Sequence, residues 1–372
     1  MLIQIHMLQN YAPANLNRDD TGSPKTAYFG EGLRGRISSQ CLKRSIRLSE
    51  VFKQAFEADG LLAKRTKRLP RLVRDELEAL GADADTIEAI VRRVPEIGSE
   101  SGRDAGKAKE DEPLETRQLI FIGANEVCPL AEKLLALYQK DPSGWAKCKI
   151  EEITKELGAS VPRSVDVAMF GRMTTSKAFE DVQAAVQVAH ALSVNPLTQE
   201  FDYFTAVDDI SGESGAGMIG DVEYNSSTYY KYINVHWEQL CTNLGGDCAA
   251  ARQAVLALLE AAATAQPSGK QNTFAAQNLP DLVLVEVRER NLPVSYANAF
   301  LKPARASREQ TVLDDATTKL ADHMARVGRV YGLEAHDRRA LTAVQDYTLP
   351  GAETVASLEN LQTWLATCLP EG

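Results

Sequence analysis

The residues best suited to chemistry in this chain lie between positions 29 and 47, where glycines and arginines lead into a predicted helix. Ser38 or Ser39 has the side chain of a helix N-cap. A helix N-terminus presents free N–H groups and the positive end of the helix dipole. Because Arg34 and Arg36 come directly before it, the stretch predicts a site for phosphate groups.

The predicted helix has two distinct faces. Leu42 and Ile46 form an apolar stripe at i, i+4 spacing, which is typical of a helix packed on a core. Polar and basic residues at i, i+3 and i+7 fall together on another face. The phosphate-binding candidates on this helix are Gln40, Lys43, Arg44 and Arg47.

The basic character of this region is local. The whole chain holds 51 acidic and 41 basic residues, with a net charge of −10. Between positions 18 and 53, however, eight basic residues stand against four acidic ones. We therefore favour a phosphate-binding role over a plain solvated surface. The eight basic residues are Arg18, Lys25, Arg34, Arg36, Lys43, Arg44, Arg47 and Lys53.

Two further segments are unusual. Residues 61–74 carry six basic side chains, for which a binding face and a solvated face are equally good interpretations. Residues 195–227 form a long glycine-rich excursion, and long loops in compact domains are usually functional or disordered. Met218 and Ile219 are apolar where a solvated loop would be polar. An apolar tip of this kind can act as a wedge between stacked bases.

Signals for an enzyme are weak. The five histidines form no metal-binding or catalytic motif, and those at positions 6, 190 and 236 are expected to be structural. The acidic pairs Asp19-Asp20 and Asp208-Asp209 are better explained as turn caps than as metal ligands. The sequence predicts no cofactor and no metal site.

Composition places the chain among globular proteins. Its 372 residues suffice for one large or two ordinary domains, with 44% hydrophobic and 25% charged residues. Neither a membrane span nor a signal peptide is predicted. The six scattered cysteines show no C-x-x-C pairing and fit reduced thiols in the cytoplasm.

The elements that must position these residues follow a recognisable order. Residues 182–194 are ambiguous between strand and helix, and residues 58–160 read as a helical insertion. Without the insertions the order is β-α-β-β-α-β, an α+β arrangement called ferredoxin-like or RNA-recognition-motif, whose sheet commonly binds single-stranded RNA. The predicted strands are 2–8, 165–170, 229–237 and 282–287, and the predicted helices are 39–57, 249–265, 313–330 and 358–369.

Six motifs in order along nearly the whole chain resemble one family. That family is CasC, the backbone subunit of the type I-E CRISPR Cascade surveillance complex. The similarity is least in residues 58–160. The motifs are Leu16-Asn-Arg-Asp-Asp20, Arg36-Ile-Ser-Ser-Gln-Cys-Leu-Lys-Arg44, Gly171-Arg-Met-Thr-Thr-Ser176, Phe204-Thr-Ala-Val-Asp-Asp209, Lys270-Gln-Asn-Thr-Phe-Ala-Ala276 and Ser295-Tyr-Ala-Asn-Ala-Phe300.

The resemblance implies a shape like a right hand. Copies of the chain would polymerise along a CRISPR RNA guide as a helical filament, bound to the other Cascade subunits and leaving guide bases free to pair with target DNA. The thumb would displace a guide base at regular intervals, and the chain itself would not be a nuclease. The implied parts are a palm of residues 1–57, 161–194 and 225–300, helical fingers of residues 58–160, a thumb loop of residues 195–224 and a C-terminal helical part of residues 301–372.

The resemblance also carries over individual guide-binding positions. Those of the palm are Arg18, Lys25, Ser38, Gln40, Lys43, Arg44 and Arg47. Further candidates are Arg172, Met173, Thr174, Lys270 and Gln271, with Met218 and Ile219 at the thumb tip.

Two alternatives stay open at the level of sequence. One is a CRISPR RNA-processing endoribonuclease on a related fold, which would need a general base or acid near the RNA. Only His6 and His190 would lie on the palm, and neither belongs to a motif. The other alternative is a cytosolic metabolic enzyme, which would purify as a small oligomer without RNA.

Overall fold

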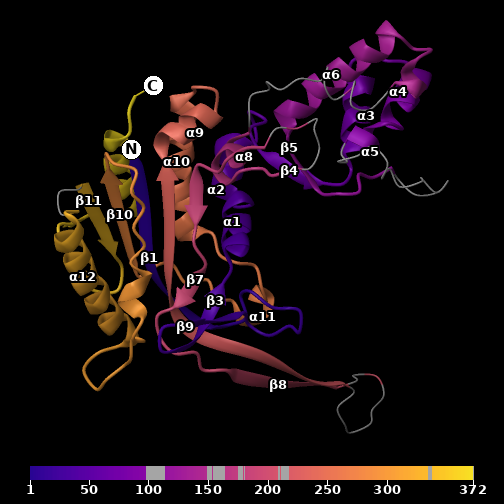
Figure 1. Cartoon of the computed structure of the whole chain (residues 1–372). Coiled ribbons are helices and arrows are strands. Elements are labelled where there is room, and N and C mark those ends of the chain that lie inside the picture. Colours follow the sequence, from indigo (N-terminus) through magenta and orange to yellow (C-terminus); the bar gives the residue numbers. More distant parts are fainter. Residues whose placement is uncertain are drawn as a thin grey trace. The chain divides into compact units, whose positions relative to one another are not determined.

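A computed structural model describes residues 1–97, 114–148, 153, 164–174, 179, 181–207, 210, 218–333 and 337–371 (Figure 1). The chain divides into two compact units. The first comprises Met1–Phe52, Gln187–His236 and Val255–Pro370. The second comprises Lys53–Val186, Trp237–Ala254 and Glu371–Gly372.

A large sheet organises the first unit. Its strands lie in the order β12-β11-β10-β1-β9-β7-β3-β2, and β6 and β8 also pair with β9. The strands are β1 (Leu2–Ala14), β2 (Thr26–Phe29), β3 (Gly32–Ile37), β6 (Val186–Val188), β7 (Ala191–Ser193), β8 (Glu200–Ala206), β9 (Met218–His236), β10 (Leu282–Arg288), β11 (Asp337–Thr342) and β12 (Glu353–Thr354).

The four central strands and two helices confirm the predicted α+β class. Strands β10, β1, β9 and β7 are neighbours, and the chain order β1, α1, β7, β9, α10, β10 is β-α-β-β-α-β. The helices of the first unit are α1 (Ser39–Arg47), α11 (Gln271–Phe274), η2 (Ala297–Phe300), α12 (Val312–Tyr331) and α13 (Leu358–Cys368). Two further helices, α2 (Glu50–Phe56) and α10 (Cys248–Thr264), have residues in both units.

Strand β1 is covered on both of its faces, since Leu2–Gln9 are all buried. On one face, Leu8 packs in a cluster with Tyr230 of β9 and with Leu313 and Leu320 of α12. Side chains alternate between faces along a strand, so the odd-numbered residues of β1 face away from α12.

The α12 face also holds a buried ionic network around Glu286. This carboxylate accepts from His6 at 3.3 Å and from Arg288 at 2.9 Å, and it pairs with Arg338 at 2.5 Å. The His6 ring stacks on Tyr296, with 4.7 Å between ring centroids. His6 is therefore a core residue, as the sequence predicted.

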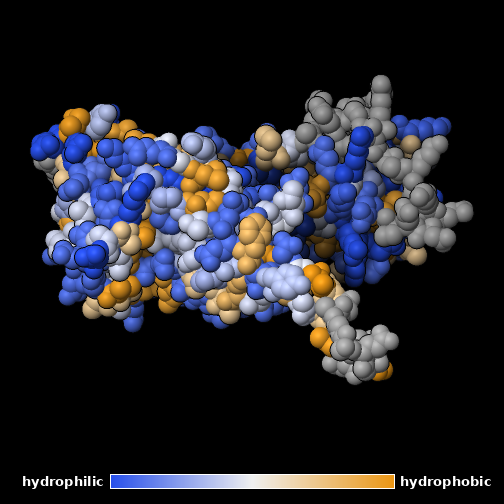
Figure 2. Space-filling model, turned by 90° about the horizontal axis from the view of Figure 1, so that it is seen from below, coloured by the Kyte–Doolittle hydropathy of each residue, from blue (hydrophilic) through white to orange (hydrophobic). Residues whose placement is uncertain are grey.

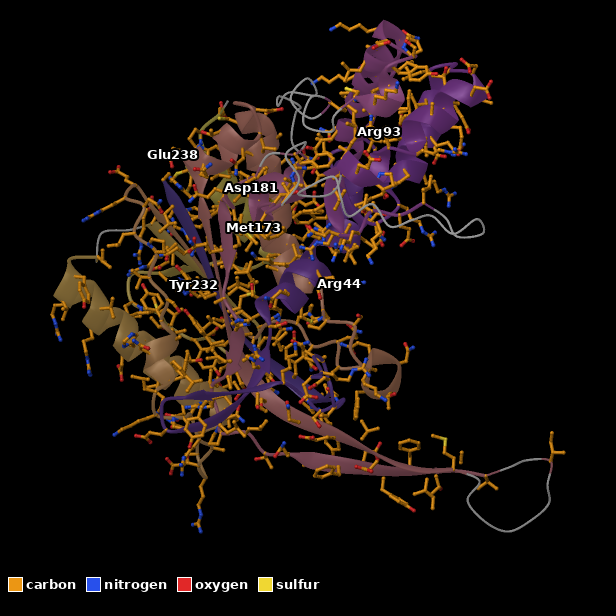
Figure 3. The ribbon with its side chains drawn as sticks, turned by 45° about the vertical axis from the view of Figure 1, so that its right-hand side comes forward. Arg44, Arg93, Met173, Asp181, Tyr232 and Glu238 are labelled. Atoms are coloured by element: carbon orange, nitrogen blue, oxygen red, sulfur yellow. The ribbon has the colours of Figure 1, made fainter. Side chains whose placement is uncertain are left out.

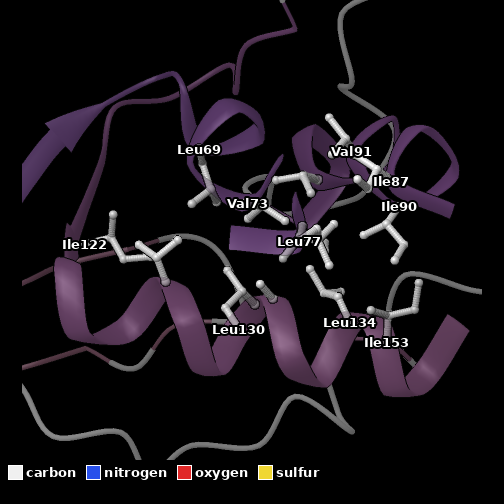
Figure 4. Packing of buried hydrophobic residues seen from close by; sticks show 14 of the residues in the cluster. Leu69, Val73, Leu77, Ile87, Ile90, Val91, Ile122, Leu130, Leu134 and Ile153 are labelled. Atoms are coloured by element: carbon white, nitrogen blue, oxygen red, sulfur yellow. The ribbon is translucent and has the colours of Figure 1, made fainter. Parts of the chain in front are cut away.

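The second unit has a helical core (Figure 4). Helix α3 contributes Leu69, Val73 and Leu77 at successive turns, and these pack with Leu130 and Leu134 of α6. Its elements are β4 (Ala63–Thr66), α3 (Leu69–Ala79), α4 (Ala84–Val91), α5 (Val94–Ile97), β5 (Ile120–Gly123), α6 (Ala124–Lys140), η1 (Trp145–Lys147), α8 (Val165–Phe170) and α9 (Trp237–Asn243).

The predicted strand at residues 165–170 is wrong, because this segment is helix α8. Val165–Met169 are all buried, so the alternation in sequence did not mark one buried and one exposed face. The Asp166 carboxylate accepts from the Ala63 backbone at 2.9 Å, which satisfies a polar group inside this core. In the chain order β-α-β-β-α-β, the second strand is β7 instead.

The predicted helix at 39–57 is two helices, α1 and α2. Helix α1 ends at Arg47, and the N–H of its C-cap residue Leu48 donates to the Arg44 carbonyl. The Ser49 hydroxyl then accepts from the Phe52 N–H at 3.3 Å and begins α2. The hairpin of β2 and β3, directly before α1, was not predicted.

The glycine-rich excursion is largely a β-hairpin rather than a loop. Strand β8 pairs antiparallel with the first part of β9, from Glu200↔Tyr224 to Ala206↔Met218. Strand β9 thus begins at Met218, eleven residues before the predicted strand at 229–237. Residues 208–209 and 211–217 lie outside the described residues.

Candidate nucleic-acid interface

An open groove of about 600 Å³ lies in the first unit, at the end of β1. It brings together three separate segments, two of which overlap the motifs at 16–20 and 36–44 and the third of which directly precedes the motif at 270–276. Arg18 and Arg44, both exposed, are its cationic side chains, and Figure 3 labels Arg44 on α1. The lining residues are 16–22, Cys41, Arg44, Ser45, Ser268 and Gly269.

Helix α1 supplies one wall, and its start is fixed by the predicted cap. The Ser38 hydroxyl accepts from the Cys41 N–H at 3.3 Å, and the Ser38 N–H donates to the Asn17 side chain at 2.8 Å. The Ser39 N–H donates to Nδ1 of His190 at 3.0 Å. The Ser39 and Cys41 N–H groups of the first helical turn are therefore occupied, which leaves cationic side chains as the main groups for phosphate.

The loop before β2 supplies the second wall. The Asp19 carboxylate accepts from the Thr21 N–H at 2.9 Å and the Ser23 N–H at 3.0 Å. Its pKa lies below the ordinary value, first because of the Thr21 hydroxyl bond and then because of the backbone bonds. Asp19 is thus a turn cap, as predicted, and it shapes the loop that presents exposed Arg18.

The third wall is the segment that leads into α11. A Cβ atom on Gly269 would lie 2.2 Å from the Leu16 carbonyl oxygen, so only glycine fits there. Lys270 follows with φ 52°, in the left-handed region. The Gln271 amide donates to the carbonyls of Pro267 and Ala276, at 3.0 and 3.2 Å, so this side chain holds its own loop together.

Arg34 is not available to phosphate, although it was counted among the eight basic residues of this region. Its guanidinium is fully buried and donates to the carbonyls of Ser193, Val194 and Phe300, at 2.8–3.1 Å. Arg36 is half-buried, and its Nε donates to the Thr26 carbonyl at 3.1 Å. The other predicted residues keep more exposure: Gln40 is exposed, and Lys25, Lys43 and Arg47 are half-buried.

Sequence reasoning missed a buried cation, Lys231. Its Nζ donates to the Tyr11 hydroxyl at 3.2 Å, and burial lowers the pKa of its amine to about 7. Lys231 pairs with Met7 across the ladder and therefore lies on the face away from α12. A lysine within the apolar run of β9 was the signal in the sequence.

The described part of the Gly171–Ser176 motif, called the Gly171–Thr174 motif below, lies in the second unit. Arg172 is buried and forms an ion pair of 2.9 Å with Glu126, so its charge is neutralised within the core. Met173 is 94% exposed beside a pocket of about 220 Å³, and the Thr174 N–H donates to Asp181 at 2.7 Å. Met173 is therefore the side chain of this motif that is best placed to contact a ligand (Figure 3).

The hairpin of β8 and β9 exposes apolar side chains. Met218 and Ile219 are 57% and 61% exposed, and Phe201 and Tyr203 of β8 are similarly exposed. Orange surface is visible on this hairpin beside the grey atoms (Figure 2). Apolar side chains left on a hairpin in this way point to a contact with another molecule.

Neither His6 nor His190 faces the groove as a free base: His6 is buried against Glu286, and His190 accepts from Ser39. Within the described ranges, no group of three His, Cys, Asp or Glu residues is arranged to hold a metal ion. No helix in these ranges is long and apolar enough to cross a membrane.

Comparison with known proteins gives a consistent result. Residues 3–366 match the family model described as CT1975-like protein. The structure is similar to a chain of a solved "CRISPR RNA-guided surveillance complex, pre-nicking", with a TM-score of 0.82, 32% identity, and 99% and 100% of the two chains covered. It is also similar to a chain of a solved "CRISPR RNA-guided surveillance complex", with a TM-score of 0.73, 27% identity and the same coverage. None of the curated proteins compared with the chain matches it.

Proposed function

The chain belongs to the family of CT1975-like proteins, and from this premise we propose that it is the guide-binding backbone subunit of a Cascade-type CRISPR surveillance complex. The observation that carries the proposal is the end-to-end similarity to a chain of a CRISPR RNA-guided surveillance complex. In this role the protein binds CRISPR RNA without cleaving it, and several copies polymerise along one guide.

The groove offers the contacts that this role requires. Spacer sequences vary, so a guide-holding protein must bind phosphates rather than read bases. Arg18 and Arg44 place two guanidinium groups at an open groove, and Lys270 follows Gly269 at its edge. Effectors of this kind leave sequence recognition to base pairing and recognise the shape and backbone of the nucleic acid.

The division into palm, fingers and thumb belongs to the same proposal. The palm holds guide phosphates through Arg18, Lys25, Gln40, Lys43, Arg44 and Arg47, with Lys270 beside them. Ser38 and Gln271 contribute indirectly, Ser38 by capping α1 and Gln271 by holding its loop together. The thumb reaches the neighbouring copy, where Met218 and Ile219 displace a guide base. Met173 and Thr174 are further guide-binding candidates, whereas the Arg172 guanidinium is occupied by Glu126. Guide bases between the displaced ones pair with the target DNA strand.

The finer assignment follows the motifs of the sequence. We place the chain in a type I-E complex in the cytoplasm, together with the large, small and guide-end-binding subunits. The acidic net charge of −10 suits this role, because acidic surfaces outside the groove limit loose binding to other nucleic acids.

The test is the mass of the purified protein with CRISPR transcripts of increasing length. A guide-coating subunit gives particles whose mass grows in discrete steps with RNA length and whose A260/A280 ratio shows bound RNA. The transcript recovered from the particles should be intact. A small oligomer whose mass does not change when RNA is added would contradict filament formation. Site-specific cleavage of repeat RNA would favour the endoribonuclease.

A further inference from the structure

Two cysteines face each other across the turn between α9 and α10. The Cys241 and Cys248 sulfur atoms are 2.8 Å apart, and both thiols are free. Gly245 and Gly246, with φ of 72° and 92°, form the turn. The Gly246 N–H donates to the Cys241 carbonyl at 2.9 Å, and the Cys248 N–H donates to the Gly246 carbonyl at 2.9 Å. The backbone therefore holds the two sulfur atoms together.

The two thiols have different environments. Cys241 is buried, and burial followed by the contact with Cys248 raises the pKa of its thiol to about 12. Cys248 is half-buried and is the first residue of α10, a helix of 17 residues. The thiolate is the reactive form of cysteine, and reaction with a dissolved disulfide requires access to the sulfur atom. Cys248 is thus suited to react first, and Cys241 to react second.

From this geometry we infer that Cys241 and Cys248 form a dithiol site for exchange with low-molecular-weight disulfides. The Cys248 thiolate attacks one sulfur of the small disulfide, whose S–S bond breaks and releases one thiolate. Cys241 then loses its proton and attacks Cys248 Sγ, which releases the second small thiol. The protein dithiol is oxidised by two electrons, and the small disulfide is reduced to two thiols. This inference does not depend on the proposed RNA-binding function.

The new disulfide bond would close a ring of residues 241–248, which includes Asn243. The side chain of Asn243 links this turn to the Gly171–Thr174 motif. The Asn243 amide donates to the carbonyls of Ala168 and Gln183, at 2.8 Å each. These carbonyls flank the bridge in which the Arg172 N–H donates to Val182 at 3.0 Å. We expect oxidation to restrain Asn243 and so to slow opening of this bridge.

The first experiment maps the products after the reduced, full-length native protein is incubated with oxidised glutathione. Peptide mass spectrometry should find a Cys241–Cys248 link in the wild type. The Cys241→Ser variant should trap glutathione on Cys248, whereas in Cys248→Ser the buried Cys241 should stay unmodified. A wild-type protein that accumulates only the Cys248 adduct, or reacts at other cysteines but at neither of these, would overturn the inference.

A second measurement tests the link to the Gly171–Thr174 motif. Amide hydrogen exchange at Arg172 should be slower in the oxidised wild type than in the reduced protein. The Cys368→Ser variant, altered at the end of α13, should show the same difference, and the Cys248→Ser variant should show none. Equal exchange in the oxidised and reduced wild type would refute the coupling even if the disulfide forms.

Discussion

Gly269 lies against Leu16 so closely that a Cβ atom on the glycine would meet the Leu16 carbonyl oxygen at 2.2 Å. The two residues are more than 250 positions apart in the chain and belong to different walls of the groove. Their contact sets the distance between the loop that carries Arg18 and the segment that carries Lys270. It therefore determines how the two cations are presented.

A methyl group at Gly269 should push these walls apart. We expect Gly269→Ala to lower the free energy of unfolding by about 1–3 kcal/mol, as overpacking does elsewhere. Chemical denaturation measures the change. Gly32→Ala is the matched control, because a Cβ at Gly32 meets no atom within 4 Å and the change should have little effect. Equal stability of the two variants would mean that the contact relaxes freely.

The two groove arginines should contribute separable phosphate contacts. We expect the Arg18→Ala/Arg44→Ala double variant to bind RNA more weakly, with a log–log salt slope reduced by roughly 0.7 per lost contact. Binding titrations at several salt concentrations give this slope. Arg290→Ala is the control. Arg290 follows the end of β10, where Arg288 pairs with Leu2, and therefore lies at the opposite end of β1 from the groove. An unchanged slope in the double variant would exclude these side chains as phosphate ligands.

Strain in the α11 segment should be measurable. Ala275 has φ 47°, and an L-residue in the left-handed region costs about 1–2 kcal/mol relative to glycine. Ala275→Gly should therefore raise the free energy of unfolding by roughly 0.5–1 kcal/mol, after the greater entropy of glycine in the unfolded chain is counted. The neighbouring Ala276 is buried with ordinary backbone, so Ala276→Gly should destabilise instead. A loss of stability on Ala275→Gly would contradict the strain.

Lys231 should make stability depend on pH. Burial lowers the pKa of its amine from 10.5 to about 7, whereas the unfolded chain keeps the ordinary value. Between these values the unfolded state binds more protons, so the free energy of unfolding rises with pH, by at most about 1.4 kcal/mol per pH unit. The Lys231→Met variant should lack this rise in the free energy of unfolding.

The test of Lys231 is denaturation of both proteins at about pH 7 and about pH 9. The advantage of Lys231→Met over the wild type should be largest at the lower pH and should shrink as the pH rises. Tyr11 and Cys41, which face Lys231, both have a pKa raised by burial and are present in both proteins. Lys25→Met, which alters a half-buried lysine, should leave the pH dependence of the wild type intact.

The exposed Met218 and Ile219 at the start of β9 should affect the geometry of the guide bases rather than the affinity for RNA. Replacing Met218 and Ile219 by glycine should leave RNA binding close to that of the wild type, because neither side chain contacts phosphate through charge. Chemical probing of the bound guide should lose its regular pattern of displaced bases. Val344→Gly, at another exposed apolar position, should keep the pattern. Unaltered base reactivity in the variant with glycine at positions 218 and 219 would contradict the proposed role of these side chains as a wedge.

Local signals in the sequence were sufficient for several elements. A cap at Ser38 or Ser39 was predicted, and the structure places it at Ser38. The buried stripe of Leu42 and Ile46 was predicted correctly, because it involves neighbours about one helical turn apart. Helix α12, predicted at 313–330, runs from Val312 to Tyr331 for the same reason. The segment 165–170 failed because periodicity cannot separate a strand from a fully buried short helix.

The sequence by itself determined the α+β class, the order of the motifs and the presence of a basic region in an acidic chain. Only the tertiary structure decided which basic residues are exposed. Arg34 was predicted at the phosphate site, but its guanidinium is taken by carbonyls of Ser193, Val194 and Phe300, far away along the chain. Burial and hydrogen bonding depend on such long-range contacts, which residue spacing does not encode.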